Sequence, residues 1–208
     1  MKQILKEIYH QINFVLLRIF NNNIAFQGKA RTHRVQISQE WGGDNRIEFR
    51  GRPLLHRCNI MFQGNNNTIV INDDTSLYDI KLHLRGNNNR IVIGKSVYMD
   101  GNCEFCVADG TEISIGDKCM IAKNISVRTT DGHYIANEEG VIINPSRNIN
   151  IGNHVWIGRD AIILKGSSIP QDCIVAAKSV VTSKLNAKKN SLLMGIPAKI
   201  YKERINWI

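Results

Sequence analysis

The chain has 208 residues, of which 43% are hydrophobic, a content typical of one folded domain and unlike that of a disordered or membrane-embedded chain. Its formal net charge of +9 favours a polyanionic partner: nucleic acid, an anionic membrane, a phosphate-rich cofactor or an acidic glycan. Because the sequence has no RRM, KH or zinc-finger pattern, no nucleic-acid partner is expected.

Residues 1–20 predict an amphipathic helix, because apolar residues recur there at helical spacing: Ile4, Leu5, Ile8, Ile12, Val15, Leu16 and Ile19. In one interpretation the helix caps the open end of the repeat described below. In the other it is an interfacial anchor that touches a membrane surface weakly. No stretch reaches the roughly 20 apolar residues of a membrane span, and no signal-peptide cleavage site follows. We therefore expect a cytoplasmic protein, at most peripheral to the inner membrane.

Residues 42–116 repeat with a period of 22. The segments GGDNRIEFR (42–50), GNNNTIVIN (64–72) and GNNNRIVIG (86–94) are each offset by that length. Such a repeat fits a three-sided coil of roughly eighteen residues with a few extra residues at one corner. Asn and Gly tolerate left-handed backbone at corners. The Asn residues at 65–67 and 87–89 are also placed to hydrogen-bond from one coil to the next.

From Ile93 a tighter period of six begins, and it is clearest between Asn148 and Thr182. Large aliphatic residues occupy every sixth position, and small or branched residues follow four positions later. The aliphatic set is Ile151, Ile157, Ile163, Ile169, Val175 and Val181, and the small set is Val155, Ala161, Ser167, Cys173 and Ser179. Neither a helix nor an ordinary strand has this period. A coil of short parallel strands does, because each turn then stacks like residues on like.

The chain has five cysteines, an odd number that suits a reducing compartment. Cys103 and Cys106 have the spacing of half a metal site, but no second pair follows. Cys103, Cys119 and Cys173 occupy the small-residue position of the six-residue repeat. The cysteines are therefore interpreted as inert core thiols.

The period breaks at Arg128 and resumes at Ile149, while the 36 residues from Ile115 to Ile151 keep its phase. The interruption predicts a loop thrown out from one corner, and long irregular loops on regular scaffolds commonly carry function. Within it, His133 is the candidate general base, because neutral imidazole accepts a proton near pH 7. The predicted organisation is a helix at 1–20, one domain at 21–200 with a loop insertion at 128–148, and a tail at 201–208.

The motifs TDGH, INIGNHVWIG, ILKGSSI, IVAAKSVVT and GIPAK complete the pattern over residues 93–200. Together they resemble the left-handed β-helix, hexapeptide-repeat acyltransferases, an all-β fold. Within these the chain looks most like the bacterial capsule and O-antigen O-acetyltransferases related to the polysialic acid enzymes. The resemblance implies a homotrimer with acetyl-CoA bound in the groove between subunits, and no metal.

The resemblance also assigns site residues. The catalytic histidine of the family falls on His133 and the tryptophan beside it on Trp156, whose alternative role is a subunit-interface aromatic. Asp131 is a candidate to orient the imidazole. The positions implied near the cofactor are Trp156, Gly158, Ala176, Ala177 and Ser179, with Lys178, Lys184 and Lys199 for its phosphates. Where the family often has Gly-Ala-Gly-Ser, this chain has Ala-Ala-Lys-Ser at 176–179, so a glycine of that motif is replaced by lysine.

The implied reaction is direct acetyl transfer to a hydroxyl of a surface polysaccharide or its precursor, and the basic charge suits an anionic, sialic acid-containing glycan. Three alternatives stay open. The enzyme could acetylate an amine of a nucleotide-linked sugar or act on a small metabolite. It could resemble γ-carbonic anhydrase, although the C-terminal half offers only His133 and His154 for zinc. It could also be a non-catalytic assembly scaffold.

Overall fold

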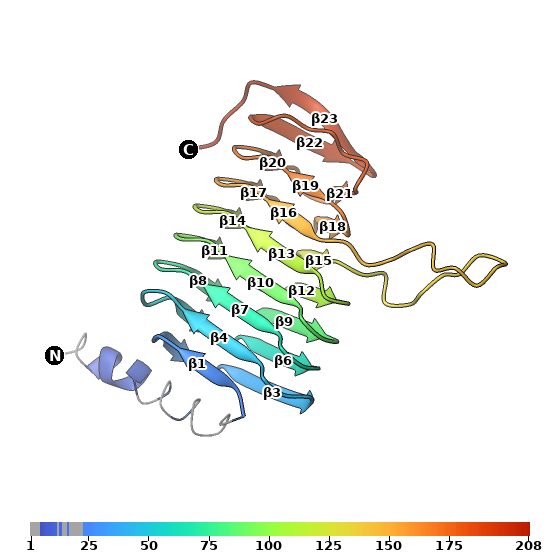
Figure 1. Ribbon diagram of the computed structural model, residues 1–208. Coiled ribbons are helices and arrows are strands. Elements are labelled where there is room, and N and C mark those ends of the chain that lie inside the picture. The colour runs from blue at the N-terminus through green and yellow to red at the C-terminus, as the bar shows by residue number, and fades with distance from the viewer. Residues whose placement is uncertain (1–4, 12, 14–15, 17–22) are drawn as a thin grey trace.

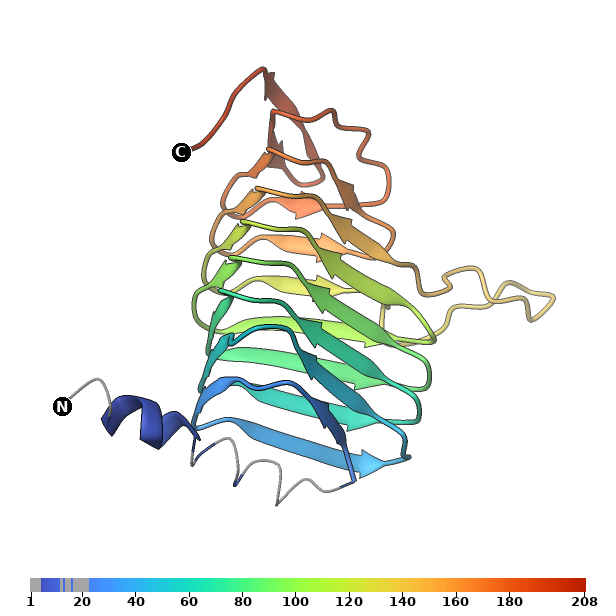
Figure 2. The ribbon, with the colours of Figure 1, turned by 60° about the vertical axis from the view of Figure 1, so that its left-hand side comes forward.

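The computed structural model describes residues 5–11, 13, 16 and 23–208, and over this part the chain winds into a three-sided coil of short strands (Figure 1). Each side of the coil is one sheet, and from β1 to β21 successive strands of the chain belong to successive sheets. The coils stack along one axis, with the N-terminal helix and the long loop on opposite sides of the rod (Figure 2). The three-sided coil that the six-residue period predicts is thus confirmed.

Three sheets make up the rod, and their strands in spatial order are as follows. Sheet A has β1 (Ala25–Gln27), β4 (Arg46–Phe49), β7 (Thr68–Ile71), β10 (Arg90–Ile93), β13 (Glu112–Ile115), β16 (Ile149–Ile151) and β19 (Ser168–Ile169). Sheet B has β2 (Arg31–His33), β5 (Leu54–His56), β8 (Ser76–Tyr78), β11 (Tyr98–Met99), β14 (Met120–Ile121), β17 (Trp156–Ile157), β20 (Ile174–Val175), β22 (Ser191–Gly195) and β23 (Ala198–Glu203). Sheet C has β3 (Gln36–Trp41), β6 (Asn59–Gln63), β9 (Ile80–Arg85), β12 (Cys103–Ala108), β15 (Ser126–Arg128), β18 (Ile162–Leu164) and β21 (Val180–Val181).

The strand registers reproduce the periods of the sequence. Ile91 pairs with Ile69 on one side and Ile113 on the other, which is the 22-residue period. Ile115 pairs with Ile151, so the long loop leaves the phase of the coil unchanged. Because like residues stack in register, the inward aliphatic side chains form one continuous core along the rod.

All five cysteines are buried and free, among them Cys103, Cys119 and Cys173, for which the six-residue period predicts burial. Burial raises the pKa of the Cys58, Cys103 and Cys119 thiols to about 11. A thiol with so high a pKa is almost entirely protonated near neutral pH and is therefore a poor nucleophile. The interpretation of these residues as inert core thiols agrees with this burial.

One corner between sheets C and A is held by a ladder of asparagine side chains. Asn67 Oδ1 accepts hydrogen bonds from the backbone N and the Nδ2 of Asn89, both at 2.9 Å. Asn45 Oδ1 accepts the same two bonds from Asn67, at 2.9 and 3.0 Å. Asn45, Asn67 and Asn89 are buried, so the ladder satisfies polar groups that water does not reach. The predicted coil-to-coil hydrogen bonding of these corners is confirmed.

The described part of the predicted N-terminal helix comprises residues 5–11, 13 and 16; positions 1–4, 12, 14–15 and 17–22 lie outside the described residues. It lies beside the first strands of sheet B (Figures 1 and 2). His10 Nδ1 is 2.9 Å from the carbonyl oxygen of Thr32, and the Tyr9 hydroxyl is 2.8 Å from His33 Nδ1. Leu5 and Ile8 remain 59% and 47% exposed, so part of the apolar stripe has no partner within the described chain.

The other end of the rod is closed by a hairpin. Strand β22 adds in parallel to β20, and β23 returns antiparallel to β22. Leu193 of β22 is fully buried and so extends the core to this end. In the described residues, no helix combines the length and the apolar character needed to cross a membrane.

Candidate functional site

Residues 129–148 form the long loop, which leaves the rod between β15 of sheet C and β16 of sheet A (Figure 1). At its base Arg147 N donates to the Thr129 carbonyl at 2.9 Å. At its tip the chain turns back on itself, with Ile143 N bonded to the Ile135 carbonyl at 2.8 Å. The break in the sequence period is therefore a projection of two chain segments, hydrogen-bonded to each other at the base and near the tip.

His133 lies in this loop with an exposed side chain, and Asn144 Nδ2 donates to its carbonyl oxygen at 2.9 Å. The neighbouring Asp131 is part of a clamp on the loop. Its Oδ2 accepts hydrogen bonds from Lys165 Nζ at 2.5 Å and from Asn144 Nδ2 at 2.9 Å. Lys165 Nζ also donates to the Asn144 carbonyl at 2.7 Å. The three residues join the outgoing and returning segments of the loop to each other and to the coil that follows.

The Lys165 ammonium holds the pKa of the Asp131 carboxyl below its usual range, and the Asn144 hydrogen bond lowers it further. Asp131 is therefore a carboxylate at neutral pH. Among the described residues no hydrogen bond joins it to the His133 imidazole, so its orienting role remains a prediction. Sequence reasoning missed Lys165 and Asn144, because a residue outside the periodic core positions carries no signal of what it contacts.

Trp156 opens strand β17 of sheet B, where its side chain faces outward and is 38% exposed. Its ring centroid lies 6.3 Å from that of Trp207 in the tail. Trp207 stacks on His154 at 4.2 Å, with 12° between the ring planes, and its Nε1 donates to the His154 carbonyl at 2.9 Å. His154 in turn is 3.0 Å from Asp172 Oδ1. The sequence predicts that Trp156 faces outward, which the structure confirms. It does not predict the contact with Trp207, because the tail lies outside the repeat and its position along the rod cannot be derived from the period.

One chain does not bring His133 and Trp156 together. The loop leaves between sheets C and A, whereas β8, β11, β14 and β17 of sheet B lie on the side of the rod away from it (Figure 1). Within the described residues no contact joins the loop to Trp156.

The positions assigned to the cofactor differ in their surroundings. A Cβ at Gly158 would lie 2.7 Å from Ala177 N, so this glycine is needed for the next coil to pack against it. The Ser179 hydroxyl is buried and accepts a hydrogen bond from Gly195 N at 3.3 Å, and both its backbone groups are also bonded within the chain. Neither position is therefore open to a ligand in this geometry.

The three lysines and the two alanines lie nearer the surface. Lys178 and Ala177 are exposed at the corner between sheets B and C, and Ala176 beside them is half-buried. Lys199 is exposed on β23, the edge strand of sheet B. Lys184 follows β21, at the same corner as the loop. The lysines thus do not gather at one place in a single chain.

In the part of the chain that the structure describes, no three His, Cys, Asp or Glu side chains come together in a group that could hold a metal ion. His133 and His154 lie on different elements, the loop and the turn before β17. The geometry gives no support to a three-histidine zinc site of the carbonic anhydrase kind.

Comparison with known proteins complements this geometry. No family model matches the chain. A polysialic acid O-acetyltransferase of Neisseria meningitidis is 34% identical over 147 residues, which are 70% of this chain and 67% of that protein. Two further curated relatives, a polysialic acid and a galactoside O-acetyltransferase, both of Escherichia coli, match over only 33% and 52% of their own lengths.

Two solved structures superimpose over most of the rod. The polysialic acid O-acetyltransferase OatWY aligns with a TM-score of 0.67 and 30% identity, over 88% of this chain and 90% of that one. The polysialic acid-specific acetyltransferase NeuO aligns with a TM-score of 0.68 and 26% identity, over 90% and 83%. With its repeat, its loop and these relatives, the chain belongs to the left-handed β-helix, hexapeptide-repeat O-acetyltransferases, in the group of the polysialic acid enzymes.

Proposed function

We propose that the protein transfers the acetyl group of acetyl-CoA to a hydroxyl of an anionic bacterial surface polysaccharide, either a capsule or an O-antigen, or its precursor. The observation that carries this proposal is the loop that holds an exposed His133 away from the rod, opposite the sheet that carries Trp156. The names of the relatives support a sialic acid-containing acceptor. The net charge of +9 suits both such an acceptor and the phosphates of CoA.

The active unit in this proposal is a homotrimer. The loop tip exposes five apolar side chains, each at least 47% accessible: Tyr134, Ile135, Val141, Ile142 and Ile143. Such a patch is unfavourable in water and typical of an interface. Because the loop and sheet B are different surfaces, contact between them is heterologous, and rotation closes it into a ring. His133 of one subunit would then face Trp156 of the next.

The same assembly accounts for the separated lysines. Lys184 lies on the loop side of one subunit, while Lys178 and Lys199 border sheet B. Across a groove between two subunits these cations would converge on the phosphates of CoA, each as a point charge. Of the positions proposed near the cofactor, Ala177 is the best suited because it is exposed, and Ala176 lies beside it. Gly158 and Ser179 are closed to direct contact and would instead hold the coil that presents these two alanines.

Acetyl-CoA supplies an acetyl group activated as a thioester. In the proposed reaction, the His133 imidazole takes the proton from the acceptor hydroxyl as its oxygen bonds to the acetyl carbon. It then returns this proton to the sulfur as the carbon–sulfur bond breaks, so the histidine ends neutral. Trp156 Nε1 or a backbone N–H would stabilise the charge that develops on the acetyl oxygen. The clamp on Asp131 holds the loop that presents His133, with Asp131 also proposed to orient the imidazole. The proposed location is the cytoplasm, with residues 1–20 at most touching the inner membrane.

Replacement of the proposed base is the decisive test. We expect His133→Ala to lower kcat about 100-fold or more, because general acid–base catalysis contributes on that scale. The assay would follow CoA release with polysialic acid, other bacterial glycans, free sugars and nucleotide amino sugars as acceptors. Glu138→Ala, at the exposed tip of the same loop, is the matched control and should retain activity. Unchanged turnover in His133→Ala, or transfer only to nucleotide amino sugars, would contradict the proposal.

A further inference from the structure

A row of aromatic rings follows the outer face of sheet B, starting at the N-terminal helix. Tyr9 and His33 have ring centroids 5.5 Å apart, and His33 and His56 lie at 4.6 Å. His56 to Tyr78 and Tyr78 to Tyr98 are each 5.7 Å. The first four strands of sheet B thus contribute one ring each, in edge-on or tilted contact from coil to coil. We call these five residues the aromatic row.

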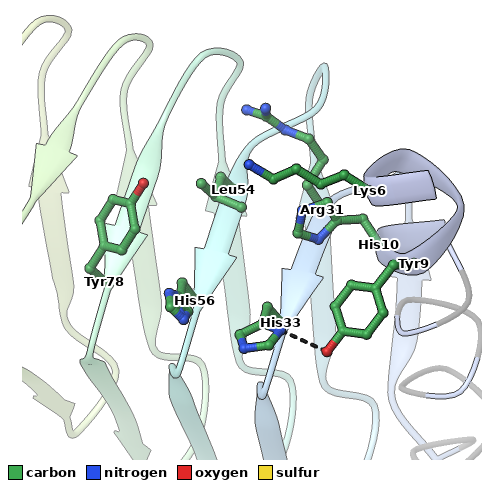
Figure 3. Close-up of a pocket in the computed structure, with 8 residues that line it drawn as sticks. All are labelled: Lys6, Tyr9, His10, Arg31, His33, Leu54, His56 and Tyr78. Carbon is green, nitrogen blue, oxygen red and sulfur yellow. Dashed lines mark hydrogen bonds between the residues drawn. The ribbon is translucent and has the colours of Figure 1, made fainter. Parts of the chain in front are cut away.

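At the helix end of the row lies a cavity of about 420 Å³ (Figure 3). The helix contributes Lys6 and His10, and Arg31 and Leu54 complete the lining with four members of the row. Figure 3 shows Lys6 and Arg31 reaching to the same side of the cavity, above the rings of His56 and Tyr78. The cavity thus joins a cationic rim to an aromatic floor.

Some polar groups of this cavity already have partners: Arg31 Nε donates to the Arg52 carbonyl at 3.3 Å, and Tyr9 is bonded to His33. Others have none among the described residues. The nearby acids are engaged elsewhere, Glu7 with Arg52 and Asp79 with Arg57. In the described part of the chain Lys6 and Arg31 form no ion pair, and the His56 imidazole and the Tyr78 hydroxyl have no hydrogen-bond partner. The cavity therefore offers two cations and two neutral hydrogen-bonding groups to a ligand.

The row continues toward the proposed active site. Tyr98 pairs in register with Met120, and Met120 with Trp156, and all three remain 38–44% exposed. Tyr98 pairs with Ser76, two residues before Tyr78. With strands about 4.8 Å apart and about 3.3 Å per residue along a strand, Tyr78 and Trp156 are separated by three strand steps and a two-residue shift, or roughly 16 Å. Aromatic and apolar side chains therefore cover one face of sheet B from the cavity to Trp156.

We propose that this cavity is a second, distal binding site for the acceptor, which holds an acidic sugar unit of the same polymer whose other unit is acetylated near Trp156. Lys6 and Arg31 bind the carboxylate, since a charge-assisted pair with guanidinium is strong and directional. The rings of His56 and Tyr78 pack against the apolar face of the sugar, and their polar atoms bond its hydroxyls. The inference rests on the proposed function, because it assumes an acidic glycan acceptor.

The position of the loop along the rod leaves the cavity accessible in the proposed trimer. The loop leaves between β15 and β16, which are at the level of β14 and β17 in sheet B. In a ring of parallel subunits, the neighbouring loop would meet sheet B at that level. The cavity on β2, β5 and β8 lies two or more coils away and stays clear of the loop.

The test compares polymer with short acceptor. Arg31→Gln and Tyr78→Ala are assayed with long polysialic acid and with sialic acid oligomers too short to span the distance from Tyr78 to Trp156. We expect KM for the polymer to rise about tenfold, which is some 1.4 kcal/mol of binding, with kcat unchanged. KM for the short oligomers should stay as in the wild type. Tyr78→Phe keeps the ring and should recover most of the polymer affinity, and Arg46→Gln, exposed on sheet A, is the charge-matched control.

A direct binding measurement separates this site from the chemistry. Calorimetry with His133→Ala should show the polymer bound, and addition of Arg31→Gln should weaken that binding about tenfold, while neutral dextran binds neither protein. Equal KM changes for long and short acceptors, or none, would overturn the distal site. A change in oligomeric mass in these variants would instead make the cavity a subunit contact and also overturn it. Absence of acetyl transfer by the wild type to any glycan would contradict the proposed function and leave the binding result to be judged by itself.

Discussion

At the scale of single residues, Asn67 shows how a corner of the coil is held. Its side chain bonds to Asn45 below, to Asn89 above and to the carbonyl of Gly86, at 2.9 to 3.0 Å. The residue is fully buried, so none of these groups can turn to water when the side chain is removed. Asn65, two positions earlier, makes a similar bond to Asn87 but is only half-buried.

We expect Asn67→Ala to lower the free energy of unfolding by about 3 kcal/mol, because a buried polar group left unpaired costs roughly 1–3 kcal/mol. Asn65→Ala is the matched control and should cost about 1 kcal/mol, since water replaces its bonds. Urea unfolding followed by circular dichroism measures both. Equal losses in the two variants would show that burial of the ladder is not what stabilises the corner.

At the scale of elements, the long loop at 129–148 is held by a clamp of side chains at its base. Its tip side chains are exposed, and Lys165 is the residue that ties Asp131 and Asn144 to the rod. The Lys165 side chain is only 18% exposed, which shields the ion pair more than a surface pair. The position of His133 therefore depends on Lys165, a residue outside the loop.

We expect Lys165→Met to lower kcat about tenfold, an effect of some 1.4 kcal/mol, with little change in the urea midpoint. Hydrogen exchange should speed up at residues 131–146 and nowhere else. Lys123→Met, which removes the weaker 3.5 Å pair with Asp100 on another corner, is the control. Unaltered exchange in the loop would show that the clamp does not hold it.

The clamp also has a defined pH range. Because Lys165 lowers the pKa of Asp131, the ion pair is fully present above the ordinary carboxyl pKa of about 3.9 and is lost as pH falls through the lower folded value. Exchange protection of the loop should therefore persist at pH 5 in the wild type. A loss between pH 7 and pH 5 would point to another titrating group.

At the scale of the whole molecule, the loop tip and the outer face of sheet B are two exposed apolar surfaces, and the proposed trimer would bury one against the other. The aliphatic tip side chains Ile135, Val141, Ile142 and Ile143 remain at least 47% exposed, while the Tyr134 hydroxyl is hydrogen-bonded to Asp109 of its own chain. Sheet B in turn exposes Tyr98, Met120 and Trp156. A solenoid of seven three-stranded coils buries its own core, so these surfaces are not needed for folding.

We expect the protein to have the mass of three chains in solution, measured by light scattering. Ile142→Ser combined with Ile143→Ser should shift it toward the monomer and reduce acetyl transfer in parallel, while the urea midpoint stays close to that of the wild type. The double variant Glu138→Ser with Glu139→Ser, at the same tip, is the control for loop substitution. A monomeric wild type with full activity would contradict the trimer and the site between subunits.

The limits of sequence reasoning follow from the same architecture. Stacked coils repeat their contacts, so the partners of Ile91 or Ile115 can be read from a period, and so can the buried state of Cys103. The partners of Asp131 and Trp156 cannot be derived in this way. Their contacts with Lys165 and Trp207 are not repeated from coil to coil, so they leave no periodic pattern in the sequence. The exposure of Leu5 and Ile8 was also hidden, because an amphipathic stripe does not say which surface it meets.

The regular spacing of the coils fixes distances along the rod in units of one strand spacing. The cavity and Trp156 are separated by a whole number of strands, so the distance between them can change only in steps of about 4.8 Å. Duplicating one 22-residue repeat between Tyr78 and Trp156 would increase the distance between the cavity and Trp156 by one strand spacing. The period on either side of the insertion would be unchanged. In a polymer of equal units, the length of this stretch of rod would then determine how far from a bound sugar the next acetyl group is placed.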